Sequence, residues 1–353
     1  MSIIFVVLLF SVLIFVHEFG HFAAAKLFGI QVNEFSMFMG PAIAKWKRGE
    51  TQYSIRCIPI GGYCAMEGED EDTDNPHSFQ KAKWWKRLIV LAAGSFMNLV
   101  IGIVIVAIVL FCQPNYATPQ IRQIESWSTV SADNGLKAGD TILKFNGQNI
   151  RVHEDFTLAT MMLQDGKYDI VVERDGDVVV LNDVSMVRQE VTNAQGEKVK
   201  LYGISFDVAE TTAASVPGRI LPTTFNQVKT VIVSLKMLLT GQASWKDMGG
   251  VVAVGQAMTE IEAASDNAAY AFLNMLYFGG FIAINLAVMN ILPIPALDGG
   301  RIIGLTLTTA IEGITKKKIN PKYEGYVHAI GMVLLLALMA IITFKDIFNI
   351  FKG

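Results

Sequence analysis

The sequence predicts an α-helical integral membrane protein, with about four transmembrane helices and an inserted soluble domain of mixed α and β structure. Three observations predict this fold class. The chain has 353 residues, 52% hydrophobic and 17% charged, with a mean hydropathy of +0.40. This composition is too apolar for a soluble protein and too charged for a chain lying wholly in the membrane. Four apolar runs are long enough to cross a bilayer, and a polar, strand-like segment separates the second from the third.

The four apolar runs are the expected transmembrane helices, and they cover residues 3–30, 88–111, 268–292 and 326–344. The first run lacks a basic start, so we expect it to be a retained span and not a cleaved signal peptide. Basic residues gather between the first and second spans and between the third and fourth. They include Lys45, Lys47, Arg48, Lys81, Lys83, Lys86, Arg301 and Lys316. The positive-inside rule therefore predicts that both loops are cytoplasmic, and that both termini and the segment between spans two and three are extracytoplasmic.

The first apolar run contains the motif HEFGH, formed by residues 17–21. On a helix, His17 and His21 share one face, at the spacing that lets two imidazoles bind one metal ion. Glu18 can accept a proton from a water molecule at such a metal. An ionisable group at membrane depth costs roughly 2.5–3.5 kcal/mol on insertion scales, so it is rare without a function. The alternative is a polar patch that meets a neighbouring helix.

A zinc site with catalytic function needs a third protein ligand beside the two histidines. Residues 290–300 read NILPIPALDGG, and Asp298 is the only carboxylate near the end of the long apolar tract. Pro293 and Pro295 interrupt the preceding helix, so the irregular backbone can hold Asp298 at membrane depth, facing the HEFGH helix. The alternative is an ordinary proline-rich loop with an exposed aspartate.

The segment 32–66 between the first two spans does not have the pattern of a helix. Residues 38–41 read FMGP, which is a turn signal, and residues 51–56 alternate like a strand. Irregular backbone exposed to lipid is not tolerated, so we expect this β-hairpin to pack on the helices or line their cavity. An edge strand at Ile60, Gly61 and Gly62 could then bind an extended substrate by β-addition. The alternative is a cytoplasmic hairpin without a catalytic role.

Three further segments complete the prediction. In the second span, Gly94, Asn98 and Gly102 form one stripe, which favours close helix packing or, for Asn98, contact with substrate. Residues 121–124, 141–145 and 168–174 of the polar segment have the pattern of strands, joined by turns such as Asn146–Gly147. Residues 225–239 repeat apolar side chains at helical spacing, so this linker is expected to lie on the membrane surface.

Taken together, HEFGH and NILPIPALDGG resemble the two motifs of the site-2 protease family of intramembrane zinc metalloproteases, of the bacterial RseP type. The resemblance runs the whole length of the chain. It implies that His17, His21 and Asp298 bind Zn²⁺ and that Glu18 is the general base. It also implies that segment 32–66 is a membrane-dipping β-hairpin. The run GLKAGD, residues 135–140, is similar to part of a PDZ domain.

The chain departs from the family pattern at two positions. Gly94 and Asn98 match the pattern on the second span, but Ser95 stands where relatives usually have proline. A loop at residues 249–255 has Gly250 in place of proline. We draw no role for that loop from the resemblance.

The resemblance implies four domains or regions: a first membrane half at 1–111, a PDZ-like extracytoplasmic domain at 112–210, an amphipathic linker at 211–267 and a second membrane half at 268–353. The expected function is zinc-dependent cleavage of transmembrane segments in regulated intramembrane proteolysis, for example of anti-sigma factors or signal-peptide remnants. Expected partners are a substrate with a single transmembrane helix and the lipid bilayer of the bacterial inner membrane, and no nucleic acid. Asn290 is a candidate donor to the substrate or its oxyanion.

Two other functions fit parts of the sequence. A catalytically silent scaffold could bind partners through the PDZ-like domain, but it would not need all four residues of the zinc site. A metal transporter could use His17, His21 and Asp298 as a transit site. It would not need a glutamate directly after the first histidine, or a PDZ-like domain.

Overall fold

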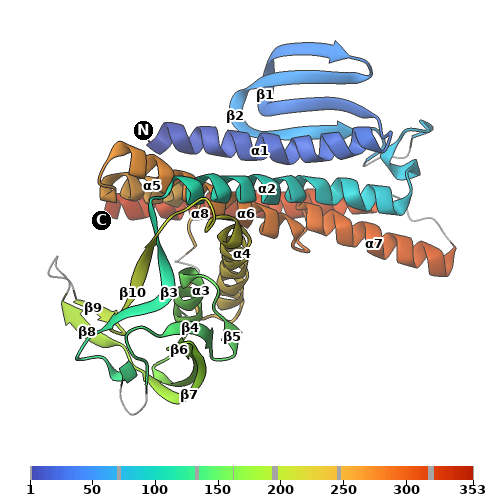
Figure 1. Ribbon diagram of the computed structural model, residues 1–353. Helices are drawn as coiled ribbons and strands as arrows, with labels where there is room; N and C mark the ends of the chain where they lie inside the picture. Colours follow the sequence, from blue (N-terminus) through green and yellow to red (C-terminus); the bar gives the residue numbers. More distant parts are fainter. Residues whose placement is uncertain are drawn as a thin grey trace. The chain divides into compact units, whose positions relative to one another are not determined.

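The computed structural model describes residues 2–69, 73–131, 135–161, 163–192, 198–244, 248–316 and 322–352 (Figure 1). The chain divides into two compact units. One unit combines Met1–Ile105 with Val231–Gly353, and the other is Val106–Thr230. The first contains the predicted motifs and the second contains most of the strands, so each is described by itself.

Four long apolar helices of the described chain match the four expected spans. They are α1 (Ser2–Leu27), α2 (Trp84–Cys112), α6 (Ala268–Ile291) and α8 (Lys322–Lys352). By length and hydropathy, the candidate spans are Ile4–Leu27, Trp84–Cys112, Ala268–Ile291 and Gly325–Asn349. The last span continues past the predicted end at residue 344 and includes the charged residue Asp346. Asp346 is 4% exposed and accepts a hydrogen bond of 2.8 Å from the Gly250 amide.

Two apolar clusters hold the membrane unit together. The first joins α1 and α6 to a short helix, α5 (Val251–Ala264), through Val6, Leu9, Leu13, Met258, Met275, Ile282 and Ala283. The second joins the end of α1 to the adjoining sheet, to α2 and to α7 (Asp298–Thr315), through Ala25, Ile30, Val32, Met66, Phe79, Val90, Leu91 and Leu305. These clusters fix α1 and the start of α7 in one packed unit.

The segment between α1 and α2 forms β1 (Val32–Arg48) and β2 (Thr51–Met66), which pair antiparallel. The prediction of a simple β-hairpin was incomplete, because β1 and β2 each fold back and together form four adjacent sheet segments. Left-handed φ angles of 71° at Phe38 and 86° at Gly40 turn β1, at the predicted turn, and Gly61 at 78° turns β2. Glu34 consequently pairs with both Ala65 and Gln52. The pairing places residues 62–66 at one edge, followed by 32–37, 51–56 and 42–48.

A polar network ties these sheet segments together. Arg56 donates hydrogen bonds to Glu34 Oε1 and to the Gly40 carbonyl, both at 2.7 Å, and also to the Tyr63 hydroxyl. Burial raises the pKa of Glu34, but the hydrogen bonds from Arg56 and Ser54 outweigh it and lower the pKa to about 2. Glu34 is therefore a charged anchor of the sheet in neutral solution.

The second unit is built on a six-stranded sheet of order β10-β3-β4-β6-β7, with β5 paired to β4. The strands are β3 (Asn115–Ile124), β4 (Thr141–Phe145), β5 (Gln148–Asn149), β6 (Gly166–Arg174), β7 (Asp177–Met186) and β10 (Ile204–Glu210). A short pair, β8 (Gln189–Thr192) and β9 (Lys198–Leu201), and the helices η2 (Thr129–Ser131) and α3 (His153–Met161) complete it. The three predicted strands are present, and α3 packs its Phe156 into the core of the sheet.

The predicted amphipathic linker contains two helices, α4 (Pro217–Leu239) and α5. The first part of α4 belongs to the second unit, since Asn226 and Lys229 each donate a 3.2 Å hydrogen bond to Asp155 of α3. In this first part Thr223, Thr224, Asn226 and Gln227 are buried, whereas Leu221 and Phe225 are exposed. That this linker lies on the membrane surface stays a prediction.

Candidate metal centre

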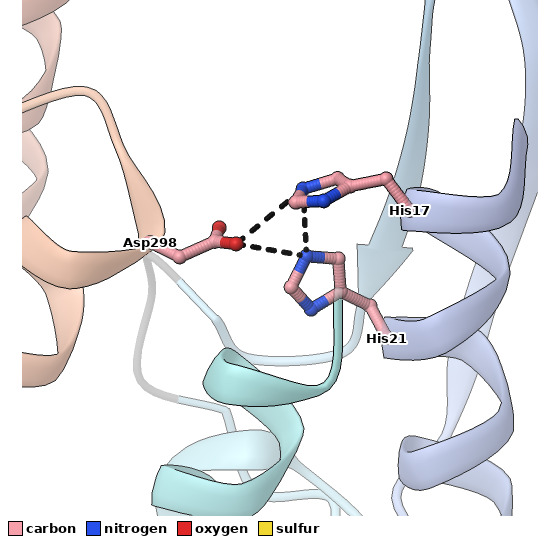
Figure 2. Close-up of side chains that lie close together, drawn as sticks. All are labelled: His17, His21 and Asp298. Carbon is pink, nitrogen blue, oxygen red and sulfur yellow. Dashed lines mark hydrogen bonds and ion pairs between the residues drawn. The ribbon is translucent and has the colours of Figure 1, made fainter. Parts of the chain in front are cut away.

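His17 and His21 lie one turn apart on α1, and Asp298 begins α7 (Figure 2). Asp298 Oδ2 lies 3.4 Å from His17 Nε2 and 3.5 Å from His21 Nε2, and the two Nε2 atoms are 3.3 Å apart. Potential ligand atoms of all three residues lie within 4.8 Å of one another. The structure therefore brings the three predicted ligands together from opposite ends of the chain.

The position of Asp298 depends on close packing of the loop before it. α6 ends at Ile291, as the prolines predict. A Cβ on Gly299 would lie 2.1 Å from the Ile291 carbonyl oxygen, and one on Gly300 would lie 2.4 Å from that of Ile294. Only glycine fits at both positions, so the sequence DGG lets α7 begin directly against the loop.

A residue of α8 also supports this loop. Ala296 has a φ of 83° and donates a 3.2 Å hydrogen bond to His328 Nδ1. His328 is therefore directed to the backbone beside Asp298. It holds the turn and is not one of the three clustered ligands.

The remaining polar contacts of the ligands come from α2. The His21 ring lies with Nδ1 2.8 Å from the Val90 carbonyl oxygen. A carbonyl can only accept, so Nδ1 carries the proton and Nε2 keeps its lone pair for a metal. Ser95 Oγ donates to Asp298 Oδ2 at 3.3 Å, and Asn98 Nδ2 lies 3.4 Å from His17 Nδ1.

This donor set fits a zinc ion. Two imidazole nitrogens and one carboxylate oxygen are a known ligand set of catalytic zinc sites. Tetrahedral bonds of about 2.0–2.1 Å place neighbouring ligand atoms roughly 3.3–3.4 Å apart, close to the separations of His17, His21 and Asp298. Gly94 leaves the room needed, since a Cβ there would lie 2.3 Å from His21 Nε2.

The predicted base lies between the ligands and the sheet. Glu18 follows His17 on α1, and a Cβ built on Gly62 would lie 3.3 Å from Glu18 Cγ. The edge segment 62–66 of β2 therefore runs beside Glu18. Gly61 provides the left-handed turn just before it, whereas the Ile60 side chain is outside the described residues. Asn290 is partly buried in the last turn of α6.

Sequence reasoning selected the three side chains that the structure brings together, His17, His21 and Asp298, but not the glycines that support them. The role of Glu18 as base stays a prediction. Gly299 and Gly300 act through the backbone of the loop, and nothing in a spacing pattern indicates this. The stripe on the second span did point to Gly94 and Asn98. It could not say that they face the histidines.

The family model of peptidase family M50 matches residues 5–338. The chain belongs to peptidase family M50. A putative zinc metalloprotease of Clostridium acetobutylicum is 36% identical to it, over 98% of this chain and 97% of the relative. Another from Clostridium perfringens is 34% identical, over 98% of both chains. The regulator of sigma-W protease RasP of Bacillus subtilis is 26% identical, over 99% of both.

Membership of M50 confirms the resemblance to the site-2 proteases. This M50 peptidase is a zinc metalloendopeptidase of that type, which agrees with the clustering of His17, His21 and Asp298. The two other functions, a silent scaffold and a metal transporter, have no support in these relatives. Four candidate spans and the bacterial relatives make it a bacterial membrane protein.

Proposed function

We propose that this M50 peptidase cleaves a membrane-spanning segment of a membrane-protein substrate at a zinc ion held by His17, His21 and Asp298. The observation that carries the proposal is the convergence of two imidazole nitrogens and a carboxylate oxygen from α1 and α7. Such a constellation of ionisable groups among apolar helices is costly, and this favours a catalytic role.

The chemistry divides between the ion and the protein. A bound zinc ion polarises the scissile carbonyl and lowers the pKa of water. Glu18 accepts the proton of the attacking water and then delivers it to the leaving nitrogen. Asn290, near the start of the loop that carries Asp298, donates a hydrogen bond to the substrate or to its oxyanion.

The substrate must be extended for this reaction. A helical amide hides its carbonyl in a hydrogen bond to the residue four positions on, so the substrate helix has to unwind. We propose that Ile60, Gly61 and Gly62 and the edge segment after them receive the unwound strand by β-addition. The closeness of Gly62 to Glu18 supports this, because a strand added at that edge would run beside the base.

The biological role and the topology follow from the same proposal. The relative in Bacillus subtilis is named for the regulation of sigma-W. We propose that this chain likewise acts in regulated intramembrane proteolysis, on substrates with a single transmembrane helix such as anti-sigma factors or signal-peptide remnants. The second unit is a PDZ-like domain that lies outside the cytoplasm with both termini, as the basic loops indicate. We propose that this domain covers residues 112–210, which follow the first membrane half in the sequence and precede the linker at 211–267.

The test is a Glu18→Gln variant of the full-length protein in detergent or proteoliposomes. Glutamine keeps the size of the side chain but cannot accept the proton. The zinc content should equal that of the wild type, and cleavage of a model single-span substrate should fall to background. Glu260→Gln, at an exposed position on α5, is the matched control and should cleave normally.

Two results would contradict the proposal. Full cleavage by the Glu18→Gln variant would show that Glu18 is not the general base. If the wild-type protein cleaved the substrate equally well after complete removal of zinc, the metal would have no part in the mechanism.

A further inference from the structure

One face of α2 reaches every ligand of the metal centre. The Val90 carbonyl accepts from His21, Ser95 donates to Asp298, and Asn98 lies against His17. We infer that Asn98 is a positioning residue that accepts a hydrogen bond from His17 Nδ1 and so fixes the tautomer that binds zinc. The inference rests on the proposed function, because it assigns the support of that zinc site.

A zinc ion at this site requires a particular tautomer of His17. His17 Nε2 is the atom that faces Asp298 and His21 Nε2, so it must offer its lone pair to the ion. A neutral imidazole that does so carries its proton on Nδ1. Metal-binding histidines almost always donate this second N–H to an oxygen. His21 has the Val90 carbonyl for this purpose.

The Asn98 side chain has a buried oxygen without a hydrogen-bond partner. Asn98 is only 1% exposed, and among the described residues no donor reaches its Oδ1. The orientation that brings Nδ2 to His17 Nδ1 therefore leaves a buried oxygen without a partner. This is unfavourable, because the oxygen has lost its hydrogen bonds to water and gained none from the protein. The oxygen and nitrogen of an asparagine side chain exchange places when the amide group is rotated by about 180°, and the hydrogen-bond network decides which orientation is assigned. The turned amide presents Oδ1 to the Nδ1 proton.

The burial of Asn98 also favours the positioning role over direct contact with substrate. The sequence alone suggested Asn98 as a substrate-binding residue. Its side chain is almost fully covered and lies on the Nδ1 side of the His17 ring, the opposite side from the Nε2 atom that faces the other ligands. Asn98 thus reaches the reaction through His17.

The experiment compares two substitutions of Asn98 in the full-length protein in detergent. Asn98→Leu keeps the size and removes the acceptor, whereas Asn98→Asp keeps the acceptor. The dissociation constant of Zn²⁺ is measured by competition with a chromogenic chelator, and the thermal unfolding midpoint is recorded for each variant. Asn274→Leu, which removes an exposed amide from α6, is the matched control.

We expect Asn98→Leu to weaken zinc binding about 10–100-fold, the usual effect of losing the partner of a metal-binding histidine. Asn98→Asp should bind zinc at least as tightly as the wild type, because a carboxylate accepts the Nδ1 proton. The control should be unchanged. A role in packing alone would reverse the order, since leucine would be tolerated and a buried aspartate would be the worse replacement.

Equal zinc affinity of Asn98→Leu and the wild type, or weaker binding by Asn98→Asp than by Asn98→Leu, would overturn the inference. Either result would leave the proposed function intact. That function fails separately, if the wild-type chain binds no zinc or if Glu18→Gln cleaves normally.

Discussion

At the scale of single residues, the metal centre depends on a missing side chain as well as on the three clustered residues. Gly94 has no side chain, and this leaves the space beside the His21 and His17 rings open. The three side chains that cluster could be predicted because they stand in the short motifs HEFGH and LDGG. Their partners on α2 could not, because Asn98 meets His17 across 81 positions and Ser95 meets Asp298 across 203.

We predict that Gly94→Ala abolishes zinc binding. A methyl group there would lie 2.3 Å from His21 Nε2 and 2.7 Å from His17 Cε1, so at least one imidazole has to leave its position. Metal content after purification and cleavage of a model substrate check this. Gly255→Ala, where a Cβ meets nothing within 4 Å, is the control and should keep both. Normal zinc content in Gly94→Ala would show that α2 does not limit the site.

At the scale of elements, hydropathy located the four spans but missed α7. This helix follows the predicted loop directly and is amphipathic, with Arg301 near its start and Ile314 exposed near its end. It does not have the continuous apolar run that identifies a span. The folding-back of β1 and β2 was also only half predicted. The FMGP turn is visible in the sequence, but the double pairing of Glu34 depends on non-local register.

The sheet gives a prediction about pH. The folded-state pKa of Glu34 is lowered to about 2, below its ordinary value of 4.5. A lowered pKa contributes stability that is fully present above about pH 4.5 and is lost as the pH falls towards about 2. Glu34→Gln should therefore lower the unfolding midpoint near pH 7, and the difference from wild type should shrink near pH 3.

The midpoint is measured by thermal unfolding of the protein in detergent at both pH values. Glu210→Gln, at an exposed position on β10, should match the wild type at both. A difference between Glu34→Gln and wild type that stays constant with pH would mean that the ion pair with Arg56 does not stabilise the sheet.

At the scale of the whole molecule, the orientation in the membrane is what the proposal needs most. Basic residues at the ends of the spans predict that the β1–β2 sheet and α7 are reached from the cytoplasm and that the second unit is outside. A protease of this topology would receive its substrate from the bilayer, and its second unit would meet the extracytoplasmic part of that substrate. Which loop faces which side is not a property of the fold, so it calls for a direct experiment.

We predict the following labelling pattern for single cysteines. In a variant lacking Cys57, Cys64 and Cys112, cysteine replaces Asp177 of the second unit or Asp74 before α2, both exposed. A membrane-impermeant thiol reagent should label Asp177→Cys in intact cells and Asp74→Cys only after lysis. These replacements leave every basic residue in place. The reverse pattern would overturn the proposed orientation.

The measurement that tests the central claim most directly is zinc K-edge X-ray absorption on the purified full-length protein, wild type and Asp298→Ala. The wild type should contain one zinc ion per chain, bound by two imidazole nitrogens and by oxygen, with no sulfur. Asp298→Ala should lose most of its zinc and its cleavage activity while still inserting into the membrane. Sulfur ligands in the wild type, more than two imidazoles, or full zinc and activity in Asp298→Ala would contradict the assignment of His17, His21 and Asp298.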